Sequence, residues 1–523
     1  MMESFVQHLH TNYVPSEPEI KLIHSHLASH ETELARLESL IRDLSAQRDQ
    51  IKAYIDPYRA LASQGRRIPQ ELLEHIFLDC LPEHRNAAMS SAEAPLLLGH
   101  ICSAWRSIAF ALPQLWAAIH VSSKFMSDVP ISELQTWLAR SASSPIAFSL
   151  QCASGETEKA LPALIDVSAR WKRVQIHGSS LQELESTAVL RVAAPWLQDI
   201  TIIFREDPVD WDITRDPTRV LVLSLFQGPS LQSVTIHTTH PIGFVPREPF
   251  LWNQLLHLTL SFPMMSDDPR IQTNHGDFTI DSALLLMKYC PRLESIHMHL
   301  YWPHAPSYQE TIFLPHLKSL TILDRSLISA QDLSYFLDHL NMPALSHLHL
   351  PSVCPQSYPD AFQPSVFSAL TDRSPLVTSL RLPLPFFDQQ SFAEILDCFP
   401  SLVVLRTIDD NHSPRGGEAP VDTAHLLHLL SHRPPSHTAE ILCPALKELV
   451  LEQEALHGDT FWVSVHEAIL GRQPLFERLE IRVRYQYQEE HGTPHFDALH
   501  ALGVQVGVGY RFPKGSPWNG VER

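Results

Sequence analysis

The chain has 523 residues, which is enough for three or four domains or for one elongated array of repeats, and 44% of them are hydrophobic. Acidic residues number 58 and basic residues 39, so the formal net charge at pH 7 is −19. An acidic surface repels nucleic acid phosphates and anionic lipids, and neither is an expected partner. The sequence shows no secretory signal and no run of about 18 apolar residues, so we expect no membrane span.

The cysteine pattern and the missing catalytic motifs narrow the function further. The seven cysteines are far apart and never spaced as C-x-x-C, which favours reduced thiols and a location in the cytoplasm or nucleus. No glycine-rich phosphate-binding motif, G-x-S-x-G or H-E-x-x-H occurs. Among the 31 histidines, two i, i+2 pairs lie on expected strands, but no cysteine or carboxylate accompanies them at ligand spacing. We therefore expect no enzyme active site, no metal and no cofactor.

The first expected element is a long helix from Glu17 to Ile55, a segment that has no glycine and no proline after Pro18. Its apolar residues follow a heptad repeat. One heptad position holds Ile20, Leu27, Leu34, Ile41 and Ile55, and the other holds Ile23, Leu37, Leu44, Ile51 and Tyr58. His30 and Arg48 are the polar exceptions. At roughly 60 Å the helix is too long to pack on one small domain, so it either forms a homodimeric coiled coil or folds back on its own chain.

Two short amphipathic helices are expected between residues 66 and 121. The first begins at Pro69, which suits a first helical position because its missing N–H needs no partner there. Its apolar stripe comprises Leu72, Leu73, Ile76, Phe77 and Cys80. After an insert at residues 82–94, the second helix is expected from Leu96 to Ala111. Its apolar face comprises Leu98, Ile101, Cys102, Trp105 and Ile108. These stripes exceed what a unit of about 55 residues can bury alone, so we expect a partner.

The same residues resemble the F-box, the module by which substrate receptors dock onto the Skp-type adaptor of cullin–RING ubiquitin ligases. The family's L-P-x-E-L-L-x-x-I-F-x-x-L opening is matched from Ile68 to Leu81, and its V-C-x-x-W-R-x-[IL]-A followed by P-x-L-W from Ile101 to Trp116. With the preceding helix and the long insert, the chain is similar to F-box proteins of mushroom-forming fungi. The resemblance implies that the adaptor-binding residues are Ile68, Pro69, Leu72, Leu73, Ile76, Phe77, Ile101, Cys102, Trp105, Leu115 and Trp116.

Beyond Val121 one phrase recurs: proline, any residue, a large apolar residue, two variable residues, then apolar, variable, apolar. It begins at Pro195, Pro229, Pro291, Pro315, Pro343, Pro375, Pro400, Pro444 and Pro474, with two weaker copies near Trp171 and Leu255. The end of each phrase alternates like a half-buried strand. Helix signals fall in the intervals at Asp281 to Tyr289, Ser329 to Leu340, Asp388 to Phe399 and Asp422 to His432. One strand and one helix at a period near 30 residues resemble leucine-rich repeats, whose architecture is an α/β horseshoe.

The variable positions of the phrases should share one exposed face, because alternate residues of a strand point to opposite sides. The residue between the last two apolar positions reads Gln175, Thr201, Thr235, Thr259, His297, Thr321, His349, Arg381, Arg406, Val450 and Glu480. Threonines suit strands in general, whereas the basic part is the candidate for binding a target. That candidate site comprises His297, His299, His347, His349, Arg381 and Arg406. We expect its positive charge to grow as the pH falls through about 6.5 and to favour an acidic or phosphorylated segment.

The expected fold is α/β, with an N-terminal helix at residues 1–62, an all-α F-box at 63–121 and a degenerate leucine-rich-repeat array, a solenoid, at 122–523. The resemblance implies a non-enzymatic substrate receptor of a ubiquitin ligase. Its F-box would bind a Skp-type adaptor and through it a cullin, and its array would hold an unknown protein target. The alternative is a non-catalytic, self-associating scaffold with no ligase role.

Overall fold

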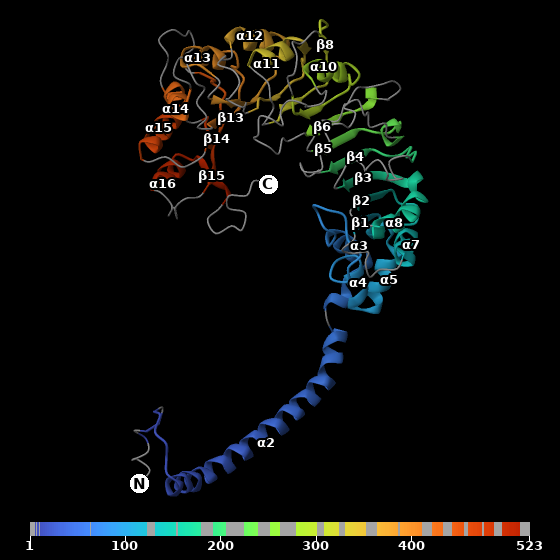
Figure 1. Ribbon diagram of the computed structural model, residues 1–523, viewed down its shortest axis with the longest axis vertical. Coiled ribbons are helices and arrows are strands. Elements are labelled where there is room, and N and C mark those ends of the chain that lie inside the picture. The colour runs from blue at the N-terminus through green and yellow to red at the C-terminus, as the bar shows by residue number, and fades with distance from the viewer. Residues whose placement is uncertain are drawn as a thin grey trace. The chain divides into compact units, whose positions relative to one another are not determined.

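The structure is a computed structural model. It describes residues 6, 8–9, 11–62, 64–122, 131–152, 155–178, 192–204, 224–238, 252–261, 279–300, 308–323, 330–351, 363–384, 387–409, 421–431, 442–453, 459–472, 475–485 and 494–512. The chain divides into two compact units, Met1–Ile76 and Phe77–Arg523. The first is dominated by one long helix, and the second holds short helices and a large parallel sheet (Figure 1). The fold is therefore mixed α/β.

The long helix of the first unit, α2, spans Glu17–Ala62. Glu19 caps its start, because Glu19 Oε2 accepts hydrogen bonds from the Ser16 N–H at 2.8 Å and from Ser16 Oγ at 2.6 Å. The helix continues past the predicted end at Ile55 and includes Pro57. Proline costs one backbone hydrogen bond there, but its fixed φ is close to the helical value. Most of the apolar heptad residues of α2 are exposed.

The residues of the predicted F-box form three helices instead of two: α3 (Gln70–Asp79), α4 (Leu96–Ile101) and α5 (Ser103–Ala111), followed by the 3-10 turn η2 (Pro113–Trp116). The prediction of a single helix from Leu96 to Ala111 is wrong at Cys102, whose φ of −160° and ψ of 167° are extended. Cys102 Sγ accepts a hydrogen bond from the Trp105 N–H at 3.4 Å. Cys102 therefore caps α5 and does not continue α4.

The described residues of the second unit form a fully parallel sheet of fourteen strands whose spatial order follows the chain. The strands are β1 (Ala118–Val121), β2 (Ile146–Cys152), β3 (Trp171–Gly178), β4 (Asp199–Phe204), β5 (Ser233–Thr238), β6 (His257–Ser261), β7 (Ser295–Met298), β9 (Ser319–Ile322), β11 (His347–His349), β12 (Ser379–Pro383), β13 (Val404–Asp409), β14 (Glu448–Gln453), β15 (Arg478–Tyr485) and β16 (Gln505–Phe512). The sheet begins within residues 63–121, the range predicted for the F-box. Its sequential order is that of a repeat, solenoid-like fold.

The same backbone hydrogen bonds recur from one repeat to the next. The Glu294 carbonyl accepts N–H groups from both Lys318 and Ser319, at 2.8 and 3.1 Å. This two-to-one pattern occurs at nine successive steps between Gln198 and Arg478 in the described part of the chain. The sequence phrase is therefore a structural repeat, and its strand residues occupy equivalent positions.

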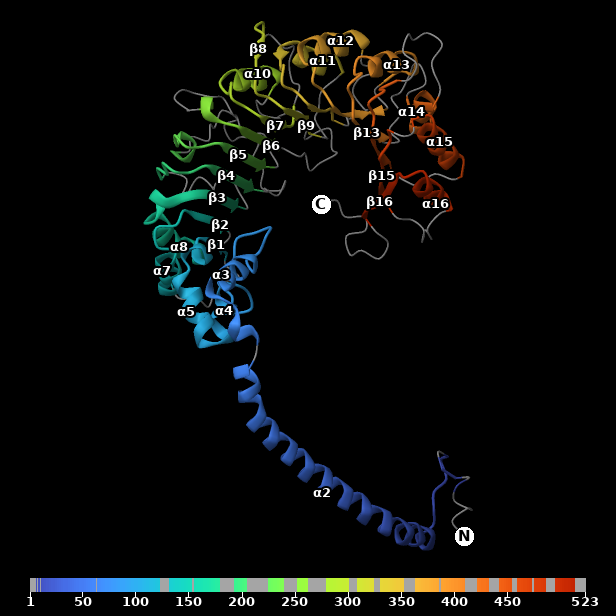
Figure 2. The ribbon, with the colours of Figure 1, turned by 180° about the vertical axis from the view of Figure 1, so that it is seen from behind.

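Helices lie along one face of this sheet in both views of the ribbon (Figures 1 and 2). The four predicted repeat helices are confirmed as α10 (Ile280–Lys288), α11 (Ala330–Asp338), α13 (Gln389–Asp397) and α14 (Thr423–Ser431). Five further helices are α7 (Ile131–Arg140), α8 (Gly155–Ile165), α12 (Pro364–Arg373), α15 (Asp459–Leu470) and α16 (Pro494–Ala501). The remaining elements are β8 (Ile312–Phe313), which pairs with β10 (Leu340–Asn341), and the 3-10 turns η1 (Gln64–Arg67), η3 (Ser168–Arg170), η6 (Ser224–Gln227) and η7 (Trp252–Gln254).

A column of apolar residues behind the strands forms the core. In ten strands, the apolar residue that precedes the variable row position is at most 2% exposed: Ile200, Val234, Leu258, Ile296, Leu320, Leu348, Leu380, Leu405, Leu449 and Leu479. Burying an aliphatic side chain of this size contributes about 1.5–3 kcal/mol. The repeated strands are thus fixed with one face toward the helices and the other free for variable residues.

The insert at residues 82–94 extends the sheet at its first edge. Ala88 forms a parallel bridge with His120 of β1, and the His120 N–H donates to the Ala87 carbonyl at 2.7 Å. Glu93 holds this conformation by accepting the Ala88 N–H at 2.5 Å. The insert thus covers an edge strand that would otherwise present unpaired backbone groups.

Candidate protein-binding surfaces

Helix α3 carries apolar side chains on two adjacent faces. Leu73 and Phe77 are buried, and the Phe77 ring centroid lies 4.9 Å from that of Trp105. Both are among the predicted adaptor contacts, and in this structure both belong to the core. Leu72 and Ile76 are 55% and 42% exposed. Residues four apart share a helix face, so this pair forms an apolar strip open to solvent.

Helix α4 carries a second exposed apolar pair, Leu97 and Ile101, while Leu98 between them is buried. Leu97 is absent from the predicted adaptor residues. Its spacing of four from Ile101 was already present in the predicted helix from Leu96 to Ala111 and was the signal that could have identified it. The other predicted adaptor residues differ in exposure, since Pro69 and Cys102 are exposed and Ile68 and Trp105 are half-buried.

Leu115 and Trp116 belong to the core of the second unit, and both are at most 1% exposed. Trp116 Nε1 donates to the Ala109 carbonyl at 2.8 Å, and the Trp116 ring packs edge-to-face on Trp137 with centroids 5.0 Å apart. The Trp137 indole N–H donates back to the Trp116 carbonyl at 3.1 Å. Leu115 and Trp116, both among the predicted adaptor contacts, therefore contribute to core packing in this structure.

The strand register aligns the predicted target face. One row runs across the sheet through Gln175, Thr201, Thr235, Thr259, His297, Thr321, His349, Arg381, Arg406, Val450 and Glu480, as the sequence phrase predicted. Paired strands lie about 4.8 Å apart, so His349, Arg381 and Arg406 are immediate neighbours. His347 is exposed on the strand of His349, and His297 lies two strands away.

Two histidines of this face, His297 and His349, have lowered pKa values. Burial lowers the pKa of His297, and burial together with nearby Arg406 and Arg381 lowers the pKa of His349 to about 4. His299 is only 4% exposed and offers little surface. The expected gain of positive charge as the pH falls through about 6.5 is therefore wrong for His349, and the lowered pKa of His297 acts against the same expectation.

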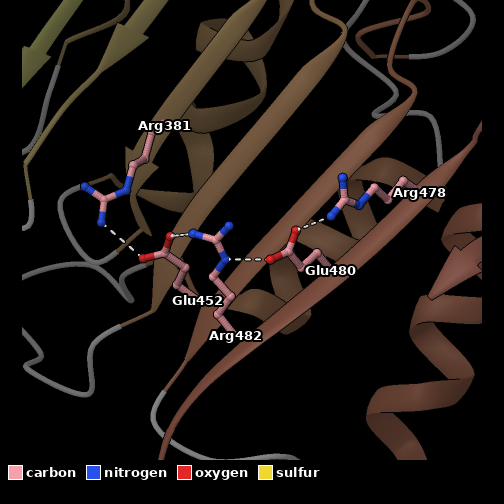
Figure 3. Close-up of polar contacts among 5 residues, drawn as sticks. All are labelled: Arg381, Glu452, Arg478, Glu480 and Arg482. Atoms are coloured by element: carbon pink, nitrogen blue, oxygen red, sulfur yellow. Dashed lines mark hydrogen bonds and ion pairs between the residues drawn. The ribbon is translucent and has the colours of Figure 1, made fainter. Parts of the chain in front are cut away.

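A chain of ion pairs includes two residues of the row, Arg381 and Glu480, and involves five side chains from β12, β14 and β15 (Figure 3). Glu452 binds Arg381 at 3.1 Å and Arg482 at 3.6 Å. Glu480 binds Arg482 at 2.8 Å and Arg478 at 3.0 Å. The hydrogen bond from Arg482 is the largest of several contacts that lower the pKa of Glu480. Arg381 is therefore already paired within the chain, a contact that the sequence pattern did not reveal.

Arg406 lies in register directly beside Arg381, and its side chain has an unused donor. Its Nε is buried without a hydrogen-bond partner, and so is Nε2 of His349. A buried polar group without a partner costs about 1–3 kcal/mol. Both residues are only half-buried, so each keeps some exposed side-chain surface beside its unpartnered nitrogen.

Metal binding and membrane crossing both require features that the described residues do not show. No group of three or more histidine, cysteine, aspartate or glutamate side chains within them could hold a metal ion. None of the described helices combines the length and the hydropathy that a bilayer crossing requires.

Comparison with known proteins gives little further information. No family model matches the chain, and no curated protein matches its sequence. Among solved structures, the chain is similar to the leucine-rich repeat-containing protein LegL7 from Legionella pneumophila, with 13% identity and a TM-score of 0.26 over 50% of this chain and 75% of that chain. At this TM-score the likeness adds nothing to the repeat pattern, which the register and the recurring hydrogen bonds establish by themselves.

Proposed function

We propose that the chain is a substrate receptor of a cullin–RING ubiquitin ligase. In this proposal the F-box segment binds a Skp-type adaptor, and the repeat array, as a leucine-rich-repeat horseshoe, binds a protein target. In this proposal the chain does not catalyse the transfer itself. It accelerates ubiquitin transfer by position, because holding the target near the conjugating enzyme raises the effective concentration of its lysines.

The observation that carries the proposal is the pair of apolar faces on α3. Leu73 and Phe77 fill the core on one side, while Leu72 and Ile76 remain exposed on the other. When a helix of ten residues has apolar side chains on two faces, each face is expected to be buried, one by the core and the other by a partner protein. The motif that resembles the F-box supports the adaptor as that cover.

The target is proposed to contact the row at Arg406 and His349, which present buried nitrogens without hydrogen-bond partners. An acidic or phosphorylated side chain would supply the acceptors, and charged acceptors give the stronger hydrogen bonds. Arg381 adds positive charge, although Glu452 already binds its guanidinium. His299 is left out because it is buried.

The adaptor interaction is tested by replacing both exposed residues of α3, Leu72→Glu with Ile76→Glu, in the full chain. We expect affinity for purified Skp-type adaptor to fall by at least about 30-fold, because interface anchors contribute about 1–3 kcal/mol each. Calorimetry or a quantitative pull-down measures the change. The fold should survive, since neither side chain is part of the core.

The matched control is Leu376→Glu with Leu475→Glu, which changes two similarly exposed leucines of the repeat array, 57% and 53% exposed. This control should bind the adaptor like the wild type. If the wild-type chain does not bind the adaptor, or if the α3 variant binds unchanged while circular dichroism shows both folded, the ligase proposal is refuted.

The second candidate function is a self-associating scaffold, which is favoured by the exposed apolar residues of α2. Leu34, Ile41, Leu44 and Ile51 are each more than half exposed along this helix. A scaffold would use this helix for assembly and would not require the adaptor. Adaptor binding separates the two candidates, because only the ligase receptor needs it.

A further inference from the structure

The heptad residues of α2 form a continuous apolar seam that faces solvent. Its exposed members along the helix are Leu27, Leu34, Leu37, Ile41, Leu44, Ile51 and Tyr58, with Ile20, Ile23 and Ile55 half-buried. A helix of 46 residues is roughly 70 Å long. We propose that α2 pairs with α2 of a second copy of this chain in an antiparallel coiled coil. This inference does not depend on the proposed ligase function.

The order of the heptad residues favours the antiparallel arrangement. In such a pair, an a residue of one helix faces a d residue of the other. We place the centre of the overlap at residue 39 of both helices. Residues at the same level then have numbers that sum to 78. The facing apolar pairs are then Ile20 with Tyr58, Ile23 with Ile55, Leu27 with Ile51, Leu34 with Leu44 and Leu37 with Ile41. Each pair occurs twice, so the apolar seam is matched over its full length.

The two polar heptad residues, His30 and Arg48, distinguish the antiparallel pair from a parallel pair more strongly than the apolar residues do. In the antiparallel register His30 faces Arg48 of the other copy, so each polar layer contains one guanidinium beside an imidazole. In a parallel pair Arg48 would face its own copy across an a layer, and two like charges would share one desolvated site. A shift by one heptad would set Arg48 against isoleucine or leucine and shorten the overlap. The pairing of His30 with Arg48 therefore selects both orientation and register.

The residues beside the seam agree with this orientation. In a parallel pair, Glu33 at position g would approach Glu38 at position e of the other copy, which is repulsive. In the antiparallel pair e residues flank e residues, and helical side chains lean toward their own N-termini. Glu31 then approaches Lys52 of the other copy, an attractive contact that occurs twice.

A hollow in the surface of α2 fits the same partner. It lies near the carboxyl end of the helix and is lined by Tyr54, Ile55, Tyr58, Arg59 and Ala62. The rings of Tyr54 and Tyr58 are 5.2 Å apart and form one wall. In the register centred on residue 39, this hollow receives the first seam residues of the partner, Ile20 and Ile23. The hollow at the carboxyl end of one helix is thus filled by apolar residues from the amino end of the other.

Energy transfer between two outward-facing positions tests the orientation in the full chain. Ser25 and Ala53 are exposed, lie at position f away from the seam, and also sum to 78. An azide-bearing amino acid at either position would carry a donor or an acceptor fluorophore without using the native cysteines. In the antiparallel dimer a donor at 25 and an acceptor at 53 lie at the same level, whereas two labels at 25 are about 42 Å apart along the axis.

We therefore expect efficient transfer for the 25/53 mixture and weak transfer for 25/25 and 53/53. The opposite ranking would show a parallel dimer and overturn the inference. No transfer in any mixture, with a monomeric mass by light scattering, would show that α2 does not self-associate and would overturn it as well.

A charge exchange gives an independent test. Glu31→Lys should weaken the dimer by about fivefold, because two lysine pairs replace two attractive pairs. Adding Lys52→Glu in the same chain should restore the affinity. In a parallel pair Glu31 adjoins His26 and Lys52 adjoins Gln47, so the second change would not rescue the first. Sedimentation equilibrium measures the dissociation constants, and the absence of rescue would refute the antiparallel register.

Discussion

Arg472 is expected to stabilise the last repeats more than any surface charge does. It is only 7% exposed, and it donates to three backbone carbonyls. Nε reaches the Leu430 carbonyl at 3.3 Å, Nη1 the Cys443 carbonyl at 3.0 Å and Nη2 the Leu442 carbonyl at 2.5 Å. Leu430 lies in the last turn of α14, where carbonyls lack partners within the helix. Arg472 thus joins the end of one helix to the chain that leads into β14.

The backbone conformation of Cys443 increases the stabilisation that we expect from Arg472. Its φ is 47°, in the left-handed region that costs a residue with a side chain about 1–2 kcal/mol. The Cys443 side chain is 1% exposed, and burial raises the pKa of its thiol to about 12. The Cys443 carbonyl, turned toward Arg472 by this backbone conformation, receives a charged donor there. The strained turn and the buried guanidinium therefore depend on each other.

The test is Arg472→Met, which keeps most of the buried volume and removes the donors. Hydrogen bonds to charged groups contribute about 1.5–3 kcal/mol each. Three bonds made by one side chain are not additive, and some carbonyls regain water, so we expect a loss of about 3–5 kcal/mol. Arg472→Lys should lose less, because an ammonium group can keep part of these contacts.

Hydrogen exchange with mass spectrometry is the suitable assay, because a repeat array need not unfold in one step. Peptides that cover α14 and β14 should lose protection in Arg472→Met, by roughly two to four orders of magnitude in exchange rate. Peptides from β1 to β3 should be unchanged. If α14 and β14 keep their protection to within about tenfold, the three hydrogen bonds do not carry the stability assigned to them.

Two further predictions concern the row. Arg406→Gln should leave the urea midpoint unchanged or slightly raised, because it removes a buried donor without a partner. The same substitution should reduce the set of proteins captured by proximity labelling. An unchanged set would place target recognition elsewhere. The pKa of His349 is about 4, below the unfolded value near 6.5, so the unfolded chain takes up a proton first and stability falls as the pH drops from about 6.5 toward 4. His349→Gln should weaken this acid dependence of the urea midpoint, and an unchanged dependence would contradict the buried environment assigned to His349.

The repeat architecture could be predicted because its signal is local and repeated many times. The alternation in each phrase specifies which residues of a strand are buried, and this is why the row from Gln175 to Glu480 is aligned in the register. The predicted caps were informative as well, since the Asp388 carboxylate accepts the Ser391 N–H at 2.8 Å at the start of α13. The helices α7, α8, α12, α15 and α16 were missed because no recurring phrase marks them.

Helix α3 and the turn η2 show why burial could not be predicted in the same way. Leu72, Leu73, Ile76 and Phe77 form one broad apolar stripe in the sequence, but only two of the four are buried. A wide stripe fits either a deep core or a core plus a partner surface, and the difference depends on what packs against α3. Trp116 has the same ambiguity, because its core role depends on Trp137, 21 residues further along the chain.

The charged face shows a further limit, because a register places residues side by side without assigning their partners. Arg381 and Arg406 are immediate neighbours in the row, and two adjacent like charges on a sheet are unfavourable. Glu452 offsets the charge of Arg381 from β14, two strands away, and leaves Arg406 with a buried donor that has no acceptor. Reach across a strand depends on side-chain length and rotamer, which no alternation pattern encodes. Tertiary packing therefore gives Arg381 an ion-pair partner and leaves Arg406 Nε without an acceptor. This difference makes Arg406 the better candidate for binding a target.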